Sequence, residues 1–307
     1  MIDLKTRYRG CLLGLAVGDA VGTTVEFSPP GSFAPVADMV GGGPFRLQAG
    51  EWTDDTSMAL CLAESLLERD GFDAADQMDR YLRWYRHGHL SSNGRCFDIG
   101  NTVSSALRRY EQTGDPWAGS TDAYSAGNGS IMRLAPVPLF FAADAARAVA
   151  MSGESSRTTH GAPACVDACR YLGGLIVGAL RGEPKDTLLS PRYCPAGAEP
   201  WAGLDPDIAA IADGSFARRS PPDIVGSGYV VRSLEAALWA FHHSDSFEEG
   251  CLLAVNLGDD ADTTAAVYGQ LAGAFYGEAG IPARWRARLA QGALITGFAD
   301  RLYEAAQ

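Results

Sequence analysis

Basic residues, paired cysteines and strand-type alternation are all scarce in this sequence, and each scarcity excludes a class of protein. The chain has 25 Lys and Arg against 37 Asp and Glu, which gives a net charge of −12. Nucleic acids and acidic membranes are bound by basic patches, so we expect neither as a direct partner. The seven cysteines are scattered and odd in number, and no CxxC pair occurs. This usage indicates free thiols in a reducing compartment.

Long apolar runs are also lacking, and we expect none to reach the roughly 20 residues of a membrane span. A short apolar stretch follows Lys5, Arg7 and Arg9, which faintly resembles a secretory signal. It is broken by Gly14 and ends at Asp19 without a cleavage motif, so we predict a core helix there. The expected location is the cytoplasm.

Helical patterns, by contrast, recur along the whole chain. With 47% hydrophobic residues, the chain can bury a sizeable core. No fixed-period repeat or low-complexity linker divides it. We therefore predict an all-α protein with many helices, forming one compact domain over residues 1–307 and acting as a monomer. The expected helices cover about 5–22, 53–69, 73–87, 101–111, 162–181, 206–213, 229–243, 246–256, 262–277 and 284–304.

Two acidic stretches, each directly before an apolar helical pattern, are the most informative part of the sequence. Helix capping explains either one alone, because Asp and Thr oxygens accept the free N–H groups of a helix start. Capping does not explain why both stretches hold so many carboxylates, since crowded carboxylates repel one another unless a proton or cation intervenes. Hard oxygen ligands suit magnesium, manganese or calcium. If the helix starts meet, they supply two threonine hydroxyls and the four carboxylates of Asp54, Asp55, Asp260 and Asp262, which is enough to hold two cations.

Four further features each have a structural and a functional interpretation. Glu26 lies among apolar residues, either solvated at a loop edge or beside a site with a raised pKa. Asp98 either caps the helix that follows it or belongs to the site. The small residues 125–130 precede the apolar segment 131–141 and can form a phosphate cradle, although they match no known fingerprint. His160 more often caps or packs than binds a ligand.

Taken in order, these motifs resemble the ADP-ribosylglycohydrolase family. The resemblance runs almost end to end and rests on Gly18–Gly22 with Glu26, Trp52–Thr56, Cys96–Thr102, Gly127–Arg133, Thr159–His160 and Asn256–Thr263. It implies an all-helical fold and a centre of two Mg²⁺ or Mn²⁺ ions, with ligands at Thr53, Asp54, Asp55, Asp260, Asp262 and Thr263.

The resemblance also implies roles for residues beyond the metal ligands. Glu26 and Asp98 become the candidate acid and base. The ADP-ribose cleft would be lined by Asp98, Gly100, Ser125, Gly127, Asn128, Gly129 and His160, with Tyr229 packing on the adenine or ribose. Two positions depart from the family pattern: Asp259 replaces a glycine, and Ala126 stands where some relatives carry an aromatic residue.

The implied function is a metal-dependent hydrolase that removes ADP-ribose from an acceptor, with arginine on a protein as the expected linkage. The bond cleaved is the one at the anomeric ribose carbon. Alternatives are a serine-linked, nucleic-acid-linked or small-molecule acceptor, a phosphohydrolase built on the same aspartates, and an ADP-ribose-binding protein without catalysis. The products discriminate among them, because only a glycohydrolase releases intact ADP-ribose.

Overall fold

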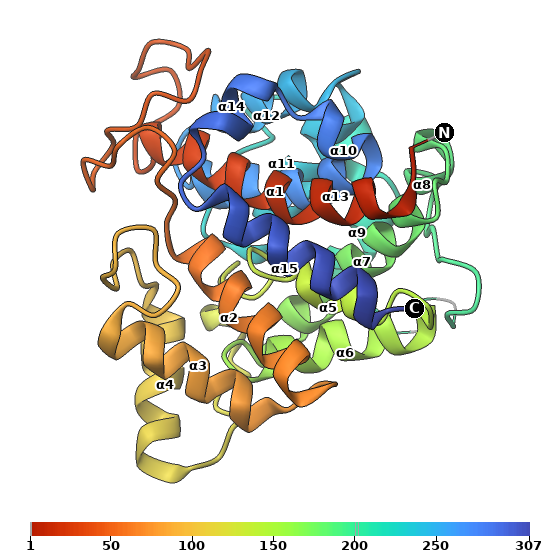
Figure 1. The fold of residues 1–307 in the computed structure, drawn as a ribbon. Helices are drawn as coiled ribbons and strands as arrows, with labels where there is room; N and C mark the ends of the chain where they lie inside the picture. The colour runs from red at the N-terminus through yellow and green to blue at the C-terminus, as the bar shows by residue number, and fades with distance from the viewer. Residues whose placement is uncertain (1, 200, 202) are drawn as a thin grey trace.

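The computed structural model describes residues 2–199, 201 and 203–307, and in these residues the chain is helical (Figure 1). Fifteen α-helices and three short 3-10 helices occur there, with isolated β-bridges but no strand. The all-α prediction is confirmed. The α-helices are α1 (Leu4–Gly22), α2 (Asp54–Arg69), α3 (Ala74–His87), α4 (Asn101–Thr113), α5 (Pro136–Phe140), α6 (Ala145–Arg157), α7 (Pro163–Leu180), α8 (Lys185–Leu188), α9 (Pro206–Ala212), α10 (Ser215–Arg218), α11 (Val230–His242), α12 (Phe247–Val255), α13 (Ala261–Tyr276), α14 (Ala283–Arg288) and α15 (Gly292–Ala305).

Helices α1 and α13 form the centre of the fold and approach each other along their whole length (Figure 1). Glycines on α1 make this possible: a Cβ at Gly10 would lie 2.2 Å from the Gly273 carbonyl oxygen, and one at Gly14 would lie 2.2 Å from that of Gly269. The paired numbers run in opposite directions, so the helices are antiparallel. The end of α1 therefore lies beside the start of α13, where Asp262 is found.

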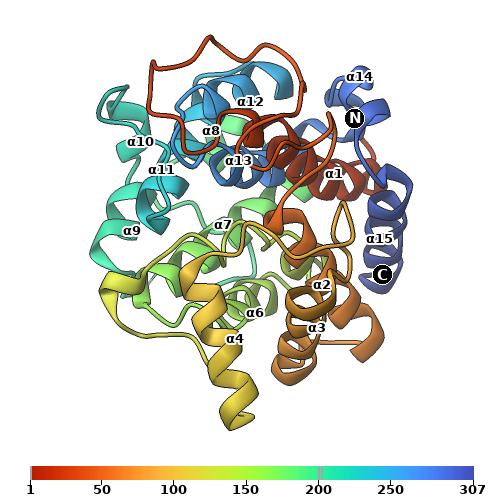
Figure 2. The ribbon, with the colours of Figure 1, turned by 90° about the vertical axis from the view of Figure 1, so that its left-hand side faces the viewer.

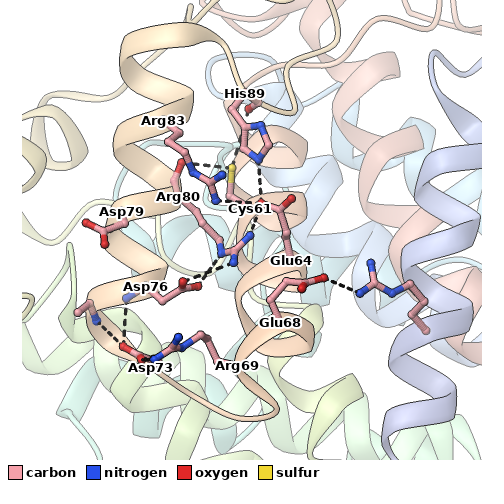
Figure 3. A network of polar contacts seen from close by, with 12 residues as sticks. Cys61, Glu64, Glu68, Arg69, Asp73, Asp76, Asp79, Arg80, Arg83 and His89 are labelled. Atoms are coloured by element: carbon pink, nitrogen blue, oxygen red, sulfur yellow. Dashed lines mark hydrogen bonds and ion pairs between the residues drawn. The ribbon is translucent and has the colours of Figure 1, made fainter.

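Helices α2 and α3 are joined by a network of charged side chains (Figure 3). Arg80 is nearly buried, pairs with Glu64 of α2, and donates to Asp76 at 2.6 Å. Glu64 also lies 2.8 Å from the His89 ring nitrogen. With Arg83, which lies 3.3 Å from the same carboxylate, one side chain on α2 thus contacts three groups from the α3 segment, which fixes the helix that carries the first acidic stretch.

The loop of residues 28–50 between α1 and α2 crosses the molecule as a long arch (Figure 2). Its position is fixed by Asn256, whose side-chain oxygen accepts from the Val36 N–H at 2.8 Å and whose amide donates to the Val36 carbonyl at 3.0 Å. Because Asn256 directly follows α12, this contact ties the loop to the segment that leads into the second acidic stretch.

The predicted helix over 284–304 is wrong in one respect, because two helices occupy it. The break falls at Ala290 and Gln291, and Gln291 adopts a left-handed conformation (φ 54°). There the Ala290 N–H donates to the Gly50 carbonyl at 2.9 Å, and the Gln291 side chain donates to the Ser91 carbonyl at 2.9 Å. Contacts with these two distant loops replace the helical hydrogen bonds, and local periodicity does not reveal them.

Helix α7 also departs from the sequence-based expectation. It spans 18 residues with a mean hydropathy of 1.3, so by length and composition it matches a membrane span, although no such run was expected. In the structure 83% of it is buried among other helices. A core helix passes the same test, and α7 packs as one.

Candidate active site

The two acidic helix starts meet. The Thr53 hydroxyl lies 3.4 Å from a carboxylate oxygen of Asp262, and the Thr263 hydroxyl lies 3.3 Å from one of Asp55. The paired residues are 209 and 208 positions apart in sequence. The packing of α1 against α13 and the arching loop before α2 bring them together, which is the condition that the cation site requires.

Neither helix start uses its oxygens in the ordinary way. Thr53 precedes α2 and Asp260 precedes α13, yet neither side chain makes a capping hydrogen bond. Capping therefore does not account for the two clusters, and their carboxylates and hydroxyls are available to the site.

Asp19, on the last turn but one of α1, holds the start of α2 instead. One of its oxygens accepts the Thr53 N–H at 2.8 Å and hydroxyl at 3.0 Å, and the other accepts the Thr56 N–H at 3.1 Å and hydroxyl at 2.6 Å. Burial raises the pKa of Asp19 to about 6, although these hydrogen bonds oppose the rise. The sequence analysis gave Asp19 no role of its own. The available signal was a carboxylate inside an apolar helix, where only a paired one is stable.

The site has a large excess of buried negative charge. Burial raises the pKa of every carboxyl group in it, and their mutual repulsion adds to the effect at several of them. The pKa of Glu26 rises to about 9 through burial and the charges of Asp98 and Asp260, and that of Asp98 rises to about 8. The remaining carboxyl groups with raised pKa values are Asp54, Asp55, Asp260 and Asp262.

These residues fit a hard divalent cation. One oxygen of Asp55 is buried and has no hydrogen-bond partner among the residues that the structure describes. Oxygens of Glu26, Asp260 and Asp262 lie within 4.8 Å of one another. A donor set of carboxylates and hydroxyls, without sulfur or imidazole, suits Mg²⁺, Mn²⁺ or Ca²⁺. Glu26, which the resemblance makes a candidate acid or base, thus lies together with two of the predicted ligands.

A cavity of about 750 Å³ opens beside the carboxylates. Most of the predicted cleft residues line it, together with Glu26: Asp98, Gly100, Gly127, Asn128, Gly129 and His160. Ser125 and Tyr229 lie outside this lining. The Ser125 hydroxyl donates to the Asp122 carbonyl at 2.6 Å, and the half-exposed Tyr229 bonds to Asp207 at 3.2 Å. Their contact with substrate stays a prediction.

Two N–H groups of the small-residue turn after Ser125 are not available for a phosphate cradle. The Gly127 N–H donates to the Ser125 carbonyl at 2.8 Å, and the Asn128 N–H donates to the Gly228 carbonyl at 3.0 Å. The next helix, α5, begins six residues after Ser130, so the turn does not open a helix. The N–H groups of Gly127 and Asn128, which the sequence analysis assigned to a ligand, are therefore already satisfied.

Asn128 contributes its side chain instead. Its amide donates to an Asp260 oxygen at 2.6 Å and faces the Ser233 hydroxyl at 3.3 Å. The turn is thereby fixed to the second acidic stretch. This hydrogen bond also orients a carboxylate that the surrounding negative charges destabilise.

Asp98 does not cap helix α4, whose N-cap residue is Gly100. It adopts a left-handed conformation (φ 60°) and lines the cavity. Asp259 is also left-handed (φ 50°), in keeping with its place in a glycine position of the family pattern. Its N–H donates to the Ser28 carbonyl at 2.8 Å, and its carbonyl accepts the Phe27 N–H at 2.7 Å. The backbone of Asp259 thus holds the loop that carries Glu26 against the second acidic stretch.

Known proteins share this sequence and fold. The family model described as ADP-ribosylglycohydrolase matches residues 1–307. The ADP-ribosylarginine hydrolase Tri1 of Serratia proteamaculans is 45% identical over 97% of this chain and 79% of its own length. That of Pseudomonas putida is 47% identical over 98% of this chain and 78% of its own length. The ADP-ribosyl-[dinitrogen reductase] glycohydrolase of Rhodospirillum rubrum is 33% identical over 94% and 91%.

A solved structure agrees with the sequence relatives. The chain of an ADP-ribosylglycohydrolase-related protein complex superposes with a TM-score of 0.87 and 47% identity, over 99% of both chains. A match over the whole sequence, three relatives above 30% identity and a shared fold lead to one conclusion: the chain belongs to the ADP-ribosylglycohydrolase family.

Proposed function

We propose that this ADP-ribosylglycohydrolase hydrolyses ADP-ribosyl-arginine on a protein, releasing ADP-ribose. The observation that carries the proposal is the junction of the two acidic helix starts at the edge of the cavity, with Thr53 beside Asp262 and Thr263 beside Asp55. The arginine linkage is supported by the two relatives named ADP-ribosylarginine hydrolase, at 45% and 47% identity.

Two divalent cations, Mg²⁺ or Mn²⁺, are the proposed cofactors. The chain would hold them through Thr53, Asp54, Asp55, Asp260, Asp262 and Thr263, with Glu26 beside them. The unpartnered Asp55 oxygen and the clustered carboxylates support this set. When bound, such ions orient ribose hydroxyls and lower the pKa of a coordinated water.

Glu26 and Asp98 are the proposed acid and base. Their pKa values of about 9 and 8 mean that each carboxyl group holds its proton at neutral pH before a cation binds. A protonated carboxyl group can donate to the leaving nitrogen as the bond to the anomeric carbon breaks, and a deprotonated one can accept a proton from water. Both line the cavity, so both can reach a substrate bound there.

The experiment uses an ADP-ribosyl-arginine peptide with Mg²⁺ or Mn²⁺, with and without a chelator, and measures free ADP-ribose. Metal-dependent release supports the proposal. Release from serine-linked, nucleic-acid-linked or small-molecule substrates alone would reassign the acceptor. AMP or phosphate as product would favour a phosphohydrolase, and ADP-ribose binding without turnover a non-catalytic protein.

The same experiment tests the two carboxyl groups. Glu26→Gln and Asp98→Asn should each lower turnover more than they lower ADP-ribose affinity. If both variants keep the normal rate, neither residue is the acid or the base.

We further propose that residues 1–307 form a single domain, that the protein is a monomer, and that it acts in the cytoplasm on an ADP-ribosylated protein. The family model over the full length supports the single domain. All seven cysteines are free thiols, which suits a reducing compartment. The excess of acidic residues supports the expectation of no direct nucleic-acid or membrane partner.

A further inference from the structure

Arg133 is a fully buried cation without a carboxylate partner among the described residues. Its guanidinium lies over the Tyr81 ring, 4.6 Å from the centroid. One nitrogen donates to the Gly129 carbonyl at 2.8 Å and another to the Thr159 hydroxyl at 2.7 Å. Burying a charge is costly unless its hydrogen bonds are well placed. Both of these bonds go to residues that lie beside or within the cavity wall.

The Thr159 hydroxyl links Arg133 to His160 through two hydrogen bonds. A guanidinium only donates hydrogen bonds, so Thr159 must accept from it. The hydroxyl then has one hydrogen to donate, and its acceptor among the described residues is Nδ1 of His160, at 2.8 Å. If Nδ1 carried a proton, the buried hydroxyl hydrogen would have no acceptor, which is unfavourable. Nδ1 is therefore the unprotonated nitrogen of the ring.

A neutral imidazole with an unprotonated Nδ1 carries its proton on Nε2. His160 is 2% exposed, yet it lines the cavity. Its Nε2 lies beside the turn, 3.4 Å from where a Cβ on Gly127 would be. Among the described residues Nε2 has no hydrogen-bond partner. Burial and the nearby Arg133 charge lower the pKa of His160 to about 3, so the ring is neutral.

We propose that Arg133 and Thr159 are positioning residues that fix His160 in the Nε2–H tautomer, so that the ring donates a hydrogen bond to an oxygen of the ADP-ribosyl group. This inference rests on the proposed function, because it assumes that the cavity binds ADP-ribose. It gives Arg133 and Thr159, two buried residues that take no part in the hydrolysis itself, a role in substrate binding.

The test compares Thr159→Val with Thr159→Ser. Valine keeps the shape of the side chain and removes the hydroxyl, whereas serine keeps the hydroxyl. Ring ¹⁵N chemical shifts, measured by NMR on protein labelled at histidine, report which nitrogen is protonated. We expect His160 to be protonated at Nε2 in the wild type and in Thr159→Ser, and to show both tautomers in Thr159→Val.

Binding of ADP-ribose is the second readout. We expect affinity about tenfold weaker for Thr159→Val and nearly unchanged for Thr159→Ser, as for loss of one well-placed hydrogen bond. The proposal is overturned if wild-type His160 is protonated at Nδ1, if it titrates near neutral pH, or if Thr159→Val matches the wild type in both readouts. The wild-type spectrum can overturn the proposal by itself, so the test remains decisive even if Thr159→Val fails to fold.

Neither readout requires turnover. If the wild type releases no ADP-ribose from an arginine-linked substrate but shows the predicted tautomer and binding, the proposed reaction fails and the tautomer assignment stands. If turnover is normal and the tautomer is wrong, only the present inference fails.

Discussion

Asp19 accepts the backbone N–H of Thr53 at 2.8 Å. Its carboxylate caps α2, whose own N-cap side chain makes no capping hydrogen bond. A carboxylate from α1 thereby satisfies the start of α2. Because this work is done from another helix, the oxygens of Thr53, Asp54 and Asp55 remain free for a cation. The relationship links the buried centre of the fold directly to the proposed chemistry.

Asp19→Asn should weaken binding of Mn²⁺ about 10- to 100-fold, as is typical when a residue that orients metal ligands is changed. An amide has one acceptor oxygen, whereas both Asp19 oxygens now accept hydrogen bonds. Isothermal titration calorimetry measures the affinity. The matched control is Asp3→Asn at the exposed start of α1, which should bind like the wild type. Equal affinity in Asp19→Asn would remove Asp19 from the metal site.

Asp260→Asn should abolish metal-dependent turnover while leaving the fold intact, because it removes a proposed ligand that Asn128 orients. The neighbouring Asp259→Asn makes the same chemical change at a residue that acts through its backbone. Asparagine tolerates its left-handed conformation, so this control should retain most activity. Circular dichroism checks folding, and ADP-ribose release checks activity. A fully active Asp260→Asn protein would contradict the ligand assignment.

The stability of the cation-free protein should fall as the pH rises from about 4 to about 8. Folded Glu26 and Asp98 keep protons up to pKa values of about 9 and 8, whereas the unfolded chain loses them near 4.5 and 3.8. The folded state thus binds more protons across this window, and its free energy of unfolding decreases with rising pH. Urea unfolding in the presence of a chelator measures the trend.

Two controls accompany the pH experiment. In the double variant Glu26→Gln, Asp98→Asn the decrease should be smaller, because two of the titrating groups are gone. Added Mn²⁺ should raise the melting temperature more at about pH 8 than at about pH 5, since the cation competes with protons for the same oxygens. A stability that rises with pH in the chelated wild type would show that these pKa values are not raised.

Gly14→Ala should lower the free energy of unfolding by about 3 kcal/mol or prevent folding, because overpacking forces close helices apart. The added Cβ would lie 2.2 Å from the Gly269 carbonyl oxygen. Gly297→Ala is the matched control: it lies within α15, and nothing comes within 4 Å of its added Cβ. The control should gain about 0.5–1 kcal/mol. Similar urea curves for the two variants would disprove the close approach of α1 and α13.

Arg80→Met should cost roughly 1.5–3 kcal/mol of stability, because it removes charged hydrogen bonds from a partly buried ion pair. The Arg80 side chain is 9% exposed, and the change removes the guanidinium that pairs with the carboxylates of Glu64 and Asp76. Arg301→Met breaks the exposed pair with Glu68, where both side chains are about half exposed, and should cost less than about 1 kcal/mol. Thermal melts that rank the two variants the other way would contradict the role of the network between α2 and α3.

Most helix positions followed from local patterns, although α6 was not expected, and the break in the C-terminal helix has a non-local cause. The helix expected over 5–22 is α1, and the one expected over 162–181 is α7, because each has apolar residues on most of its faces and clear end signals. The C-terminal helix was predicted as one because the pattern around Gln291 still appears helical. Its break depends on hydrogen bonds to Gly50 and Ser91, which no local pattern contains.

Some residues of the site were likewise predictable from the sequence, whereas the roles of others depend on tertiary contacts. The charge density of Asp54, Asp55, Asp260 and Asp262 predicted a cation site before any contact was known, since crowded carboxylates are unstable without one. Asp19 was missed because its role lies in four hydrogen bonds to a segment more than 30 residues away. The interpretation of Asp98 as a cap fails because Gly100 occupies the N-cap position of α4, and Asp98, two residues earlier, adopts a left-handed conformation.

By itself, the sequence determined most of the helices, the all-α class, the family and the identity of the acidic residues. These depend on residue type and short-range spacing, which the chain carries everywhere. Only the tertiary structure decided that Asp19 caps α2 and that the N–H groups of Gly127 and Asn128 are already hydrogen-bonded. The same holds for the contact of Arg133 with His160 through Thr159. Each of these depends on hydrogen bonds between distant segments, and such bonds exist only once the close packing of α1 against α13 has fixed the helices in place.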